Sequence, residues 1–353
     1  MKRYVQEFLK EHGKHVSSIA LIGGFIFDYF TLTTIDRLYD NMVFLFYLVV
    51  VSVCIVLFGV LDVKGVKNRV YRYLPIVMQF AFGGLFSGFT VFYSRSTDFS
   101  VHLLFILILA GLLVGNELLK EKYERLVFQV SLLFVALISY TTFSIPIIVN
   151  RIGTGVFLAS SIISSVAILL FVWMMYRLIP TRVIKAKKHL IISLGSIFVF
   201  VQIMYFLNVI PPIPLILKEA QVYSSIQKEG QIYIATRPRE RWYEYVIPGQ
   251  IVHSTAGAPL YLFSSVYSPA DFSFPVVHHW QYFEGEKWVT TDKISFIATG
   301  GTDMGYRGYT RKNHLEEGVW RVDIETENGQ IIGREVFTVS YNQGGVEIKE
   351  DIL

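Results

Sequence analysis

The sequence predicts a bundle of about seven transmembrane α-helices followed by an all-β domain of the immunoglobulin-like sandwich type. Long apolar runs fill the chain as far as about Pro211 and then stop. Basic residues gather in alternate connections between these runs, as they do in membrane proteins of fixed orientation. Beyond residue 241, short strand-like segments recur at regular spacing, with no helical periodicity between them.

Composition supports two modules, one in lipid and one in water. Of the 353 residues, 53% are hydrophobic and only 17% are charged, and the mean hydropathy is +0.46. The pI of 8.9 does not indicate nucleic-acid binding, because the chain from residue 213 onward is acidic, with 13 Lys and Arg against 18 Asp and Glu. The one cysteine, Cys54, allows no intrachain disulfide and is expected to pack as a small buried hydrophobe.

The apolar runs define the predicted elements of the membrane half. Segment 1–15 is expected to lie at the interface as a short amphipathic helix. The predicted spans are 16–33, 42–61, 73–94, 100–118, 127–149, 153–179 and 189–211. The first run is not a signal peptide, because it contains Asp28 and lacks a small-residue cleavage site. A linker is expected over 212–241 and the β domain over 242–353.

Basic residues predict the orientation in the membrane. One set of alternate connections, with the N-terminus, carries sixteen of them: Lys2, Arg3, Lys10, Lys14, Lys64, Lys67, Arg69, Arg72, Lys120, Lys122, Arg125, Arg177, Arg182, Lys185, Lys187 and Lys188. The other set holds three: Arg37, Arg95 and Arg151. Because cytoplasmic loops carry the excess of Lys and Arg, the N-terminus is expected inside and the C-terminal domain outside the cytoplasm. The cytoplasmic connections are expected to be about ten residues long, too short for a kinase or cyclase domain.

Acidic residues near the first span form the candidate intramembrane site. An ionised Asp at mid-bilayer costs about 2.5–3.5 kcal/mol, so Asp28 is expected to face the bundle interior or a cavity. It could serve as a proton or cation site, or as a structural partner of Arg37. Asp36 and Asp40 are four residues apart and would share one helical face. This pair could bind a cation, or form a solvated surface paired with Arg37.

Small residues in later spans are expected to pack helices together. Gly84 with Gly88, and Gly111 with Gly115, match the small-xxx-small pattern that permits close helix contact. Four serines in the sixth span are also small enough to pack tightly: Ser160, Ser161, Ser164 and Ser165. The spans lack matching broken helices in two halves, which argues against an inverted-repeat transporter.

The C-terminal part of the sequence is predicted to form β-strands. The predicted strands are 242–247, 259–268, 275–283, 288–298, 318–326 and 331–340. Apolar and charged residues alternate over Trp320–Glu325, as in a strand with one buried face. Asn328-Gly329 and Glu284-Gly285 are expected to form hairpin turns.

Two segments of this domain could carry chemistry. His278 and His279 resemble a metal pair, but neighbouring strand residues point to opposite faces, so His278 is expected in the core beside Trp280 and His279 at the surface. The glycine-rich segment Gly300–Lys312 is the best ligand candidate, because cationic and tyrosine side chains suit an anionic or sugar-like partner. The candidate binding residues are His279, Tyr306, Arg307, Tyr309, Arg311 and Lys312, and the alternative for the glycine-rich segment is an ordinary loop with a solvated basic rim.

The sequence resembles a known bacterial family, the domain of unknown function 2914. The resemblance rests on Leu260–Tyr267, Val277–Trp280, Gly305–Lys312 and Gly318–Asp323. The membrane half is similar to that of the family's multi-span members over Gly24–Asn41 and at the exit Pro211–Leu215. The resemblance implies a bacterial inner-membrane protein, and it implies no activity, cofactor or catalytic residue; with the orientation predicted above, the C-terminal domain is expected to be periplasmic or extracellular.

Three functions remain open at this point. The leading one is a non-enzymatic membrane protein whose outward domain binds an envelope protein, a glycan or a lipid-linked molecule. The second is a transporter, or a proton- or cation-coupled membrane protein, centred on Asp28. The third is an enzyme acting on a lipid-linked substrate. No nucleophile elbow, zinc-ligand helix, dinucleotide fingerprint or kinase signature occurs, so no catalytic residue, metal or cofactor is predicted.

Overall fold

The structure is a computed structural model, and it describes residues 26, 38–95, 99–118, 125–149, 151–210, 215–230, 232–238, 250–267, 274–298, 306–341 and 348–353. The chain divides into two compact units. The helical unit comprises Met1–Arg95 and His102–Ile213, and the β unit comprises Ser96–Val101 and Pro214–Leu353.

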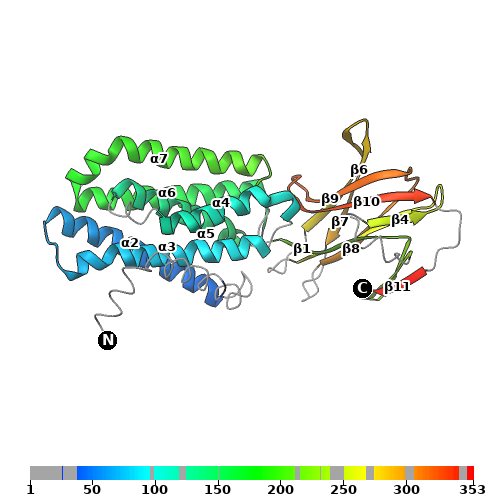
Figure 1. Ribbon diagram of the computed structural model, residues 1–353, viewed down its shortest axis with the longest axis horizontal. Coiled ribbons are helices and arrows are strands. Elements are labelled where there is room, and N and C mark those ends of the chain that lie inside the picture. Colours follow the sequence, from blue (N-terminus) through cyan, green and yellow to red (C-terminus); the bar gives the residue numbers. More distant parts are fainter. Residues whose placement is uncertain are drawn as a thin grey trace, which may run out of the picture. The chain divides into compact units, whose positions relative to one another are not determined.

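Among the described residues, six long helices precede the strands (Figure 1): α2 (Leu38–Val63), α3 (Arg69–Arg95), α4 (Phe99–Leu118), α5 (Leu126–Val149), α6 (Thr154–Leu178) and α7 (Pro180–Phe206). All of these except α4 are long and apolar enough to cross a membrane, and α4 contributes a shorter apolar stretch, Leu103–Gly115. They match six of the seven predicted spans. The predicted segment 1–15 and the predicted span 16–33 lie outside the described residues, apart from Ile26.

Helix α7 begins earlier than predicted, at Pro180 and not near residue 189. A single residue, Ile179, separates it from α6, so the predicted connection of about ten residues is wrong here. Pro180 favours a helix start, because its ring fixes φ and its missing N–H would have no partner in the first turn. Arg182, Lys185, Lys187 and Lys188 therefore lie on the first turns of α7, whereas Arg177 lies in the last turn of α6.

Aromatic rings hold three of the helices together. Phe44 of α2 stacks on Phe89 of α3 with the ring centroids 5.1 Å apart. Phe143 of α5 lies edge-on to Phe44, with the centroids 5.7 Å apart. Such pairs stabilise packing beyond the area that they bury.

Close helix packing is found at one of the two predicted glycine pairs. A Cβ added at Gly84 would lie 2.9 Å from the Tyr47 ring, so α3 approaches α2 closely there. At Gly111 and Gly115, no described atom lies within 4 Å of an added Cβ. Three of the four serines of α6 are fully buried, as tight packing requires: Ser160, Ser161 and Ser164.

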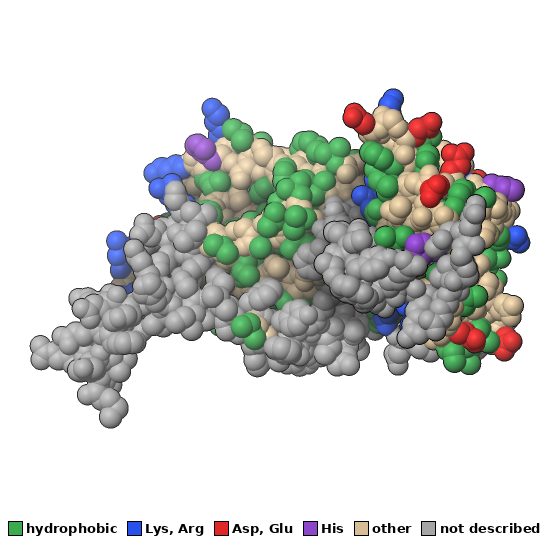
Figure 2. Space-filling view, turned by 45° about the vertical axis from the view of Figure 1, so that its right-hand side comes forward, with side chains coloured by type: hydrophobic (Ala, Val, Ile, Leu, Met, Phe, Trp, Pro, Cys, Tyr) green, Lys and Arg blue, Asp and Glu red, His purple; other side chains and the backbone are tan. Residues whose placement is uncertain are grey.

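An ion pair brings two basic segments to one end of the helical unit. Arg182 Nη1 at the start of α7 donates to Asp62 Oδ2 near the end of α2, at 3.0 Å. The Tyr71 hydroxyl of α3 donates to Asp62 Oδ1 at 2.9 Å. The start of α7 and the α2–α3 connection therefore lie together. Figure 2 shows Lys and Arg side chains gathered at one end of this unit and hydrophobic side chains along its flank.

The described strands of the β unit are β1 (Ile216–Tyr223), β2 (Ser225–Glu229), β3 (Ile232–Pro238), β4 (Gln250–Ser254), β5 (Leu260–Tyr267), β6 (Phe274–Glu284), β7 (Lys287–Ala298), β8 (Tyr306–Lys312), β9 (Gly318–Thr326), β10 (Ile331–Tyr341) and β11 (Ile348–Ile352). They form a central sheet in the order β1-β5-β8, a large sheet in the order β4-β10-β9-β6-β7, and a small sheet in the order β11-β3-β2. Neighbouring strands are antiparallel except β4 and β10, which are parallel.

Five of the six predicted strands are confirmed, as β5, β6, β7, β9 and β10. The sixth, 242–247, lies outside the described residues. The segment 212–241, predicted as a linker, is instead part of the β unit, because its described residues form β1, β2 and β3. These strands are short and rich in polar residues, so their apolar pattern is weak. Segment 306–312, predicted as part of a loop, is the strand β8.

The central sheet is packed on both faces. On one face, Thr310 of β8 accepts a hydrogen bond from Trp280 Nε1 of the large sheet, at 3.3 Å. On the other face, Phe263 of β5 packs edge-on against Tyr233 of the small sheet, with the ring centroids 5.5 Å apart. Because successive side chains of a strand point to opposite faces, alternate residues of β5 and β8 enter two different layers.

A turn is found near each predicted dipeptide, although the central residues of the first turn are Gly285 and Glu286 and not Glu284 and Gly285. Between β6 and β7, Gly285 and Glu286 have φ angles of 52° and 70°, the left-handed values that a type I′ turn needs at both central positions. Between β9 and β10, Gly329 has a φ of 76° and donates its N–H to the Thr326 carbonyl at 2.9 Å. This second connection comprises residues 327–330 and is longer than the predicted two-residue turn.

The contact between β8 and β7 yields a prediction. A Cβ added at Gly308 would lie 2.2 Å from Cε2 of the Phe296 ring. We expect Gly308→Ala to lower the free energy of unfolding of the β unit by about 1–3 kcal/mol, the usual cost of overpacking. Adding Phe296→Leu should recover part of the loss, because it removes the clashing ring. Denaturant unfolding of the full chain, followed by tryptophan fluorescence, measures both; a neutral Gly308→Ala would contradict the contact.

Candidate functional site

Strand β8 separates the predicted ligand residues into two groups. Tyr306 and Thr310 are buried on the face toward the large sheet, whereas Arg307, Tyr309 and Arg311 share the opposite face. Tyr306 is therefore a buried residue of the core. Lys312 forms an ion pair with Asp292 of β7 and lies over the Trp320 ring, 5.8 Å from its centroid.

The second group joins two further tyrosines to form what we name the tyrosine–arginine cluster: Tyr233, Tyr261, Arg307, Tyr309 and Arg311. The Arg307 guanidinium lies 5.7 Å from the Tyr233 ring centroid, and the Arg311 guanidinium lies 5.9 Å from that of Tyr261. Tyr309 stands between them, 6.0 Å from the ring of Tyr233 and 6.0 Å from that of Tyr261. Cations and ring faces thus alternate across β3, β5 and β8.

A pocket of about 660 Å³ adjoins this cluster and shares Arg307 with it. We name it the polar pocket. Its lining comes from the central and small sheets: Lys218, Glu219, Gln221, Tyr223, Arg237, Phe263, Ser265, Arg307, Asp351, Ile352 and Leu353. The lining has three cationic and two acidic side chains, so cations are in excess.

Charges inside the polar pocket are coupled. Arg237 Nε lies 2.8 Å from Asp351 Oδ2. Burial acts to raise the pKa of Asp351, but the hydrogen bonds and charges of Lys349 and Arg237 together hold it below its ordinary value. Burial raises the pKa of Glu219, with a further rise from Asp351 and an opposing effect of Arg237. Protonation of Glu219 therefore becomes easier than that of an exposed glutamate, which increases the excess of positive charge in the pocket.

His278 lies in the core, as predicted. Its imidazole is fully buried, with Nε2 2.8 Å from Ser264 Oγ of β5 and Nδ1 2.8 Å from Thr310 Oγ1 of β8. Hydroxyl groups can donate or accept, so a neutral imidazole is fully satisfied here. Burial lowers the pKa of His278 to about 3. The residue links the large sheet to the central sheet as a neutral hydrogen-bonding group.

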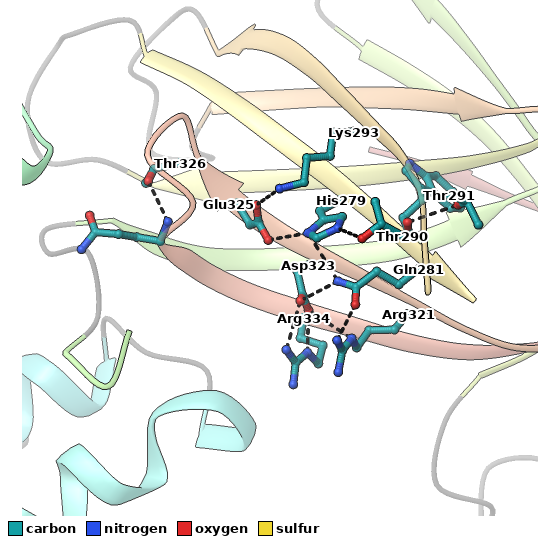
Figure 3. A network of polar contacts seen from close by, with 12 residues as sticks. His279, Gln281, Thr290, Thr291, Lys293, Arg321, Asp323, Glu325, Thr326 and Arg334 are labelled. Atoms are coloured by element: carbon teal, nitrogen blue, oxygen red, sulfur yellow. Dashed lines mark hydrogen bonds and ion pairs between the residues drawn. The ribbon is translucent and has the colours of Figure 1, made fainter. Parts of the chain in front are cut away.

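His279 was predicted at the surface, and it does lie on the outer face of the large sheet, but its hydrogen-bonding partners leave its side chain only 14% exposed. Its Nδ1 lies 2.7 Å from Glu325 Oε1 and its Nε2 lies 2.8 Å from Thr290 Oγ1. An ionised carboxylate only accepts, so Nδ1 carries the proton in this pair. His279 thus lies away from the tyrosine–arginine cluster, on the large sheet, and belongs to a separate set of polar contacts (Figure 3).

These contacts form what we name the carboxylate network, built on the outer face of the large sheet. Lys293, His279, Asp323 and Arg334 lie opposite one another in a row across β7, β6, β9 and β10. Arg334 donates to both oxygens of Asp323, at 2.5 and 3.1 Å, and Gln281 Nε2 donates to Asp323 Oδ2 at 3.0 Å. Figure 3 shows these side chains pointing toward one another. The alternation in β9 predicted an exposed charged face, but Asp323 and Glu325 are buried beneath their partners.

Three members of the network could ligate a metal. His279, Asp323 and Glu325 each offer a ligand atom, and these atoms lie within 4.8 Å of one another. Both oxygens of Asp323 already accept hydrogen bonds from Arg334, and Lys293 Nζ lies 3.7 Å from Glu325 Oε2. A divalent cation would have to displace these cationic partners. The contacts therefore fit a neutralised ion-pair network better than a metal centre.

Sequence reasoning missed Tyr233 and Tyr261 as members of the tyrosine–arginine cluster, and missed Asp323 and Glu325 as buried acids. The register explains both omissions. Tyr261 pairs directly with Arg311 across β5 and β8, which only the strand assignment of 306–312 could have indicated. Likewise, Asp323 lies opposite His279.

The candidate intramembrane residues are not placed. Asp28, Asp36 and Arg37 lie outside the described residues. Asp40 lies within α2, but the structure does not describe its side chain.

The neutral state of His278 yields a prediction about pH. In the unfolded chain, the His278 imidazole takes up a proton near pH 6.5. In the folded chain, it does so only near pH 3. Acid therefore favours unfolding through this window, by about 1.4 kcal/mol per pH unit, and the effect is absent above pH 6.5. We expect His278→Gln to remove this part of the pH dependence while keeping a neutral hydrogen-bonding side chain. Denaturant unfolding at a series of pH values measures it, and equal pH slopes in the two proteins would contradict a buried neutral imidazole.

The carboxylate network yields a prediction about stability. Asp323→Asn leaves the Arg334 guanidinium without its carboxylate, and we expect a loss of about 3 kcal/mol in the free energy of unfolding. The matched control is Asp292→Asn, because the Asp292 side chain is 44% exposed and that of Asp323 only 4%. The control should cost less than about 1 kcal/mol. Equal costs for the two substitutions, measured by denaturant unfolding, would show that Asp323 is not held as a buried pair.

Comparisons with known proteins identify part of the β unit. A family described as "Protein of unknown function (DUF2914)" matches residues 275–339. This range runs from β6 into β10, and so includes β8 and most of the carboxylate network. The match confirms the resemblance noted in the sequence for this part of the chain. Residues 260–267 and the helical unit lie outside it.

Two other comparisons add no functional information. No curated protein matches the chain. Among solved structures, the chain is similar to "Pseudomonas fluorescens alkylpurine DNA glycosylase AlkC bound to DNA containing an abasic site analog", with 10% sequence identity over 76% of this chain and 80% of that chain. The TM-score is 0.21, which is too low to support a shared fold or function. Residues 275–339 are thus the part of the chain that is similar to a described family.

Proposed function

We propose that this chain is an integral protein of a bacterial cytoplasmic membrane that presents its β unit outside the cytoplasm to bind an envelope partner. The central and large sheets would form an immunoglobulin-like sandwich, with the small sheet added to it. The ligand-binding face is the tyrosine–arginine cluster together with the polar pocket. The partner is an anionic glycan, a lipid-linked sugar or an envelope protein with an acidic, sugar-like or aromatic surface.

The orientation is supported by which helix ends carry charge. The Arg182–Asp62 pair brings together the start of α7 and the α2–α3 connection, both of which are rich in Lys and Arg. Arg95 and Arg151 lie at the opposite ends of α3 and α5. By the positive-inside rule the basic end faces the cytoplasm. Helix α7 begins at that end, so the strands that follow it emerge on the other side.

The observation that carries the binding proposal is the alternation of guanidinium groups and tyrosine rings. Stacked arginines present a planar fork that fits carboxylate and phosphate oxygens, and the rings offer flat faces to sugars or to other cations. Arg311 is exposed, whereas Arg307, Tyr261 and Tyr309 are half-buried. A half-buried aromatic surface with an exposed cationic edge is typical of recognition sites, in which Tyr and Arg contribute much of the binding free energy.

The cluster also explains why an interaction function is favoured over catalysis. The charged residues of the polar pocket are already coupled to one another, as Arg237 is to Asp351. The side chains can hold and orient a partner through charge and stacking.

The test is native mass spectrometry of the full chain, purified from producing cells into lipid nanodiscs. We expect wild type to carry a partner, and Arg307→Ala with Arg311→Ala to reduce its occupancy at least tenfold, since charged groups at a binding surface each contribute about 1.5–3 kcal/mol. The matched control is Lys287→Ala with Lys293→Ala, which removes the same charge from the large sheet. A second variant, Arg307→Lys with Arg311→Lys, keeps the charge but loses the planar stacking.

The outcomes separate the candidate functions. Loss of the partner in the double alanine variant alone supports the proposal, and partial loss in the lysine variant assigns part of the affinity to guanidinium stacking. A partner retained at full occupancy by the double alanine variant would contradict it. In that case Asp28→Asn becomes the next variant, because the bound molecule would then belong to the helical unit.

A further inference from the structure

A second pocket, of about 690 Å³, lies in the helical unit between the first turns of α5 and α7. We name it the basic pocket. Its cationic or ionisable side chains are Arg125, Arg182, Lys185 and His189. The rest of the lining is Leu126, Val127, Phe128, Ser131, Ala186 and Ser193. The pocket therefore combines cationic groups with an apolar wall.

Helical spacing accounts for the basic side. Arg182, Lys185 and His189 are separated by three and four residues, so they lie along one face of α7. Arg125 immediately precedes α5 and supplies a cation from the facing helix. The Arg182 guanidinium is fixed by its ion pair with Asp62 at 3.0 Å. Arg125, Lys185 and His189 are exposed, and no ion pair to them is found among the described residues.

Two serine hydroxyl groups also line the pocket. Ser131 Oγ of α5 and Ser193 Oγ of α7 lie 2.7 Å apart, joined by a hydrogen bond. The first turn of α5 borders the pocket through Leu126, Val127 and Phe128. The backbone N–H groups of a first helical turn have no intrahelical partner, and the helix dipole makes that end positive. Cations, hydroxyl groups and a helix start all favour an anion here.

The apolar wall decides which anion fits. A small hydrated anion would make no favourable contact with the apolar side chains, which are Leu126, Val127, Phe128 and Ala186. These side chains can instead contact the first carbons of an acyl chain or the glycerol backbone. Basic pockets between membrane helices are known to favour anionic head groups. We propose that the basic pocket binds the phosphate of an anionic phospholipid, with Arg125 and Lys185 as its principal contacts.

The test uses the full chain in vesicles of phosphatidylcholine containing a minor share of phosphatidylglycerol. Protein is extracted in mild detergent, and the retained lipids are counted by native mass spectrometry. We expect wild type to retain phosphatidylglycerol well above its share of the vesicle. Arg125→Ala and Lys185→Ala should each lower this enrichment by about fivefold. Both side chains are exposed, so their loss leaves the helix packing intact.

Two controls make the result specific. Lys187→Ala with Lys188→Ala removes two exposed cations of α7 that do not line the pocket, and it should leave the enrichment unchanged. Arg125→Lys with Lys185→Arg exchanges the cations and should retain the enrichment. A parallel arm adds inorganic phosphate to vesicles of pure phosphatidylcholine.

Each outcome decides the proposal. Enrichment that is lost only in the Arg125 and Lys185 alanine variants supports it. Equal loss in the Lys187 and Lys188 control would overturn it in favour of general surface charge. Retention of inorganic phosphate, without enrichment of phosphatidylglycerol, would overturn the lipid assignment and identify a site for free phosphate. Absence of any enrichment in wild type would overturn it altogether.

Discussion

The alternation of side chains along a strand that is covered on both faces governs the organisation of the β unit. In β8, Thr310 points into the layer shared with the large sheet, where it holds His278 and Trp280. Its neighbours Tyr309 and Arg311 point into the opposite layer and stack with Tyr233 and Tyr261. One strand thus supplies both core and candidate binding surface. A shift of register by one residue would exchange the two sets, placing cations in the core and hydroxyl groups at the surface.

Charge is handled differently in the parts of the molecule. On the large sheet, Asp323 and Glu325 are covered by cationic partners from β7 and β10, so the carboxylate network is internally neutralised and adds to stability. In the tyrosine–arginine cluster, the guanidinium groups lie over tyrosine rings. In the basic pocket, three exposed cationic or ionisable side chains gather beside an apolar wall. The last two arrangements therefore suit an anionic partner, whereas the first is satisfied by the protein itself.

Much of the architecture could be predicted from the sequence, because long apolar runs and two-residue alternation are local signals. The helices α2 to α7 and five strands belong to this class. The failures occurred where tertiary contacts override local pattern. Segment 306–312 begins beside glycines and carries charge, yet pairing with β5 makes it a strand. The charges of Asp323 and Glu325 suggested solvent, yet cross-strand partners bury them. Pairs such as Tyr261 with Arg311 depend on register, which no single segment specifies.

The orientation of the chain is the claim on which the proposed binding function outside the cytoplasm depends, and labelling of single cysteines tests it most directly. In a Cys54→Ala background, Lys287→Cys places a thiol at the exposed β6–β7 turn and Lys67→Cys places one in the α2–α3 connection. Cells stripped of their outer envelope are treated with a membrane-impermeant maleimide. The account predicts that position 287 is labelled in intact cells and that position 67 is labelled only after permeabilisation. Labelling of position 67 but not position 287 in intact cells would contradict it.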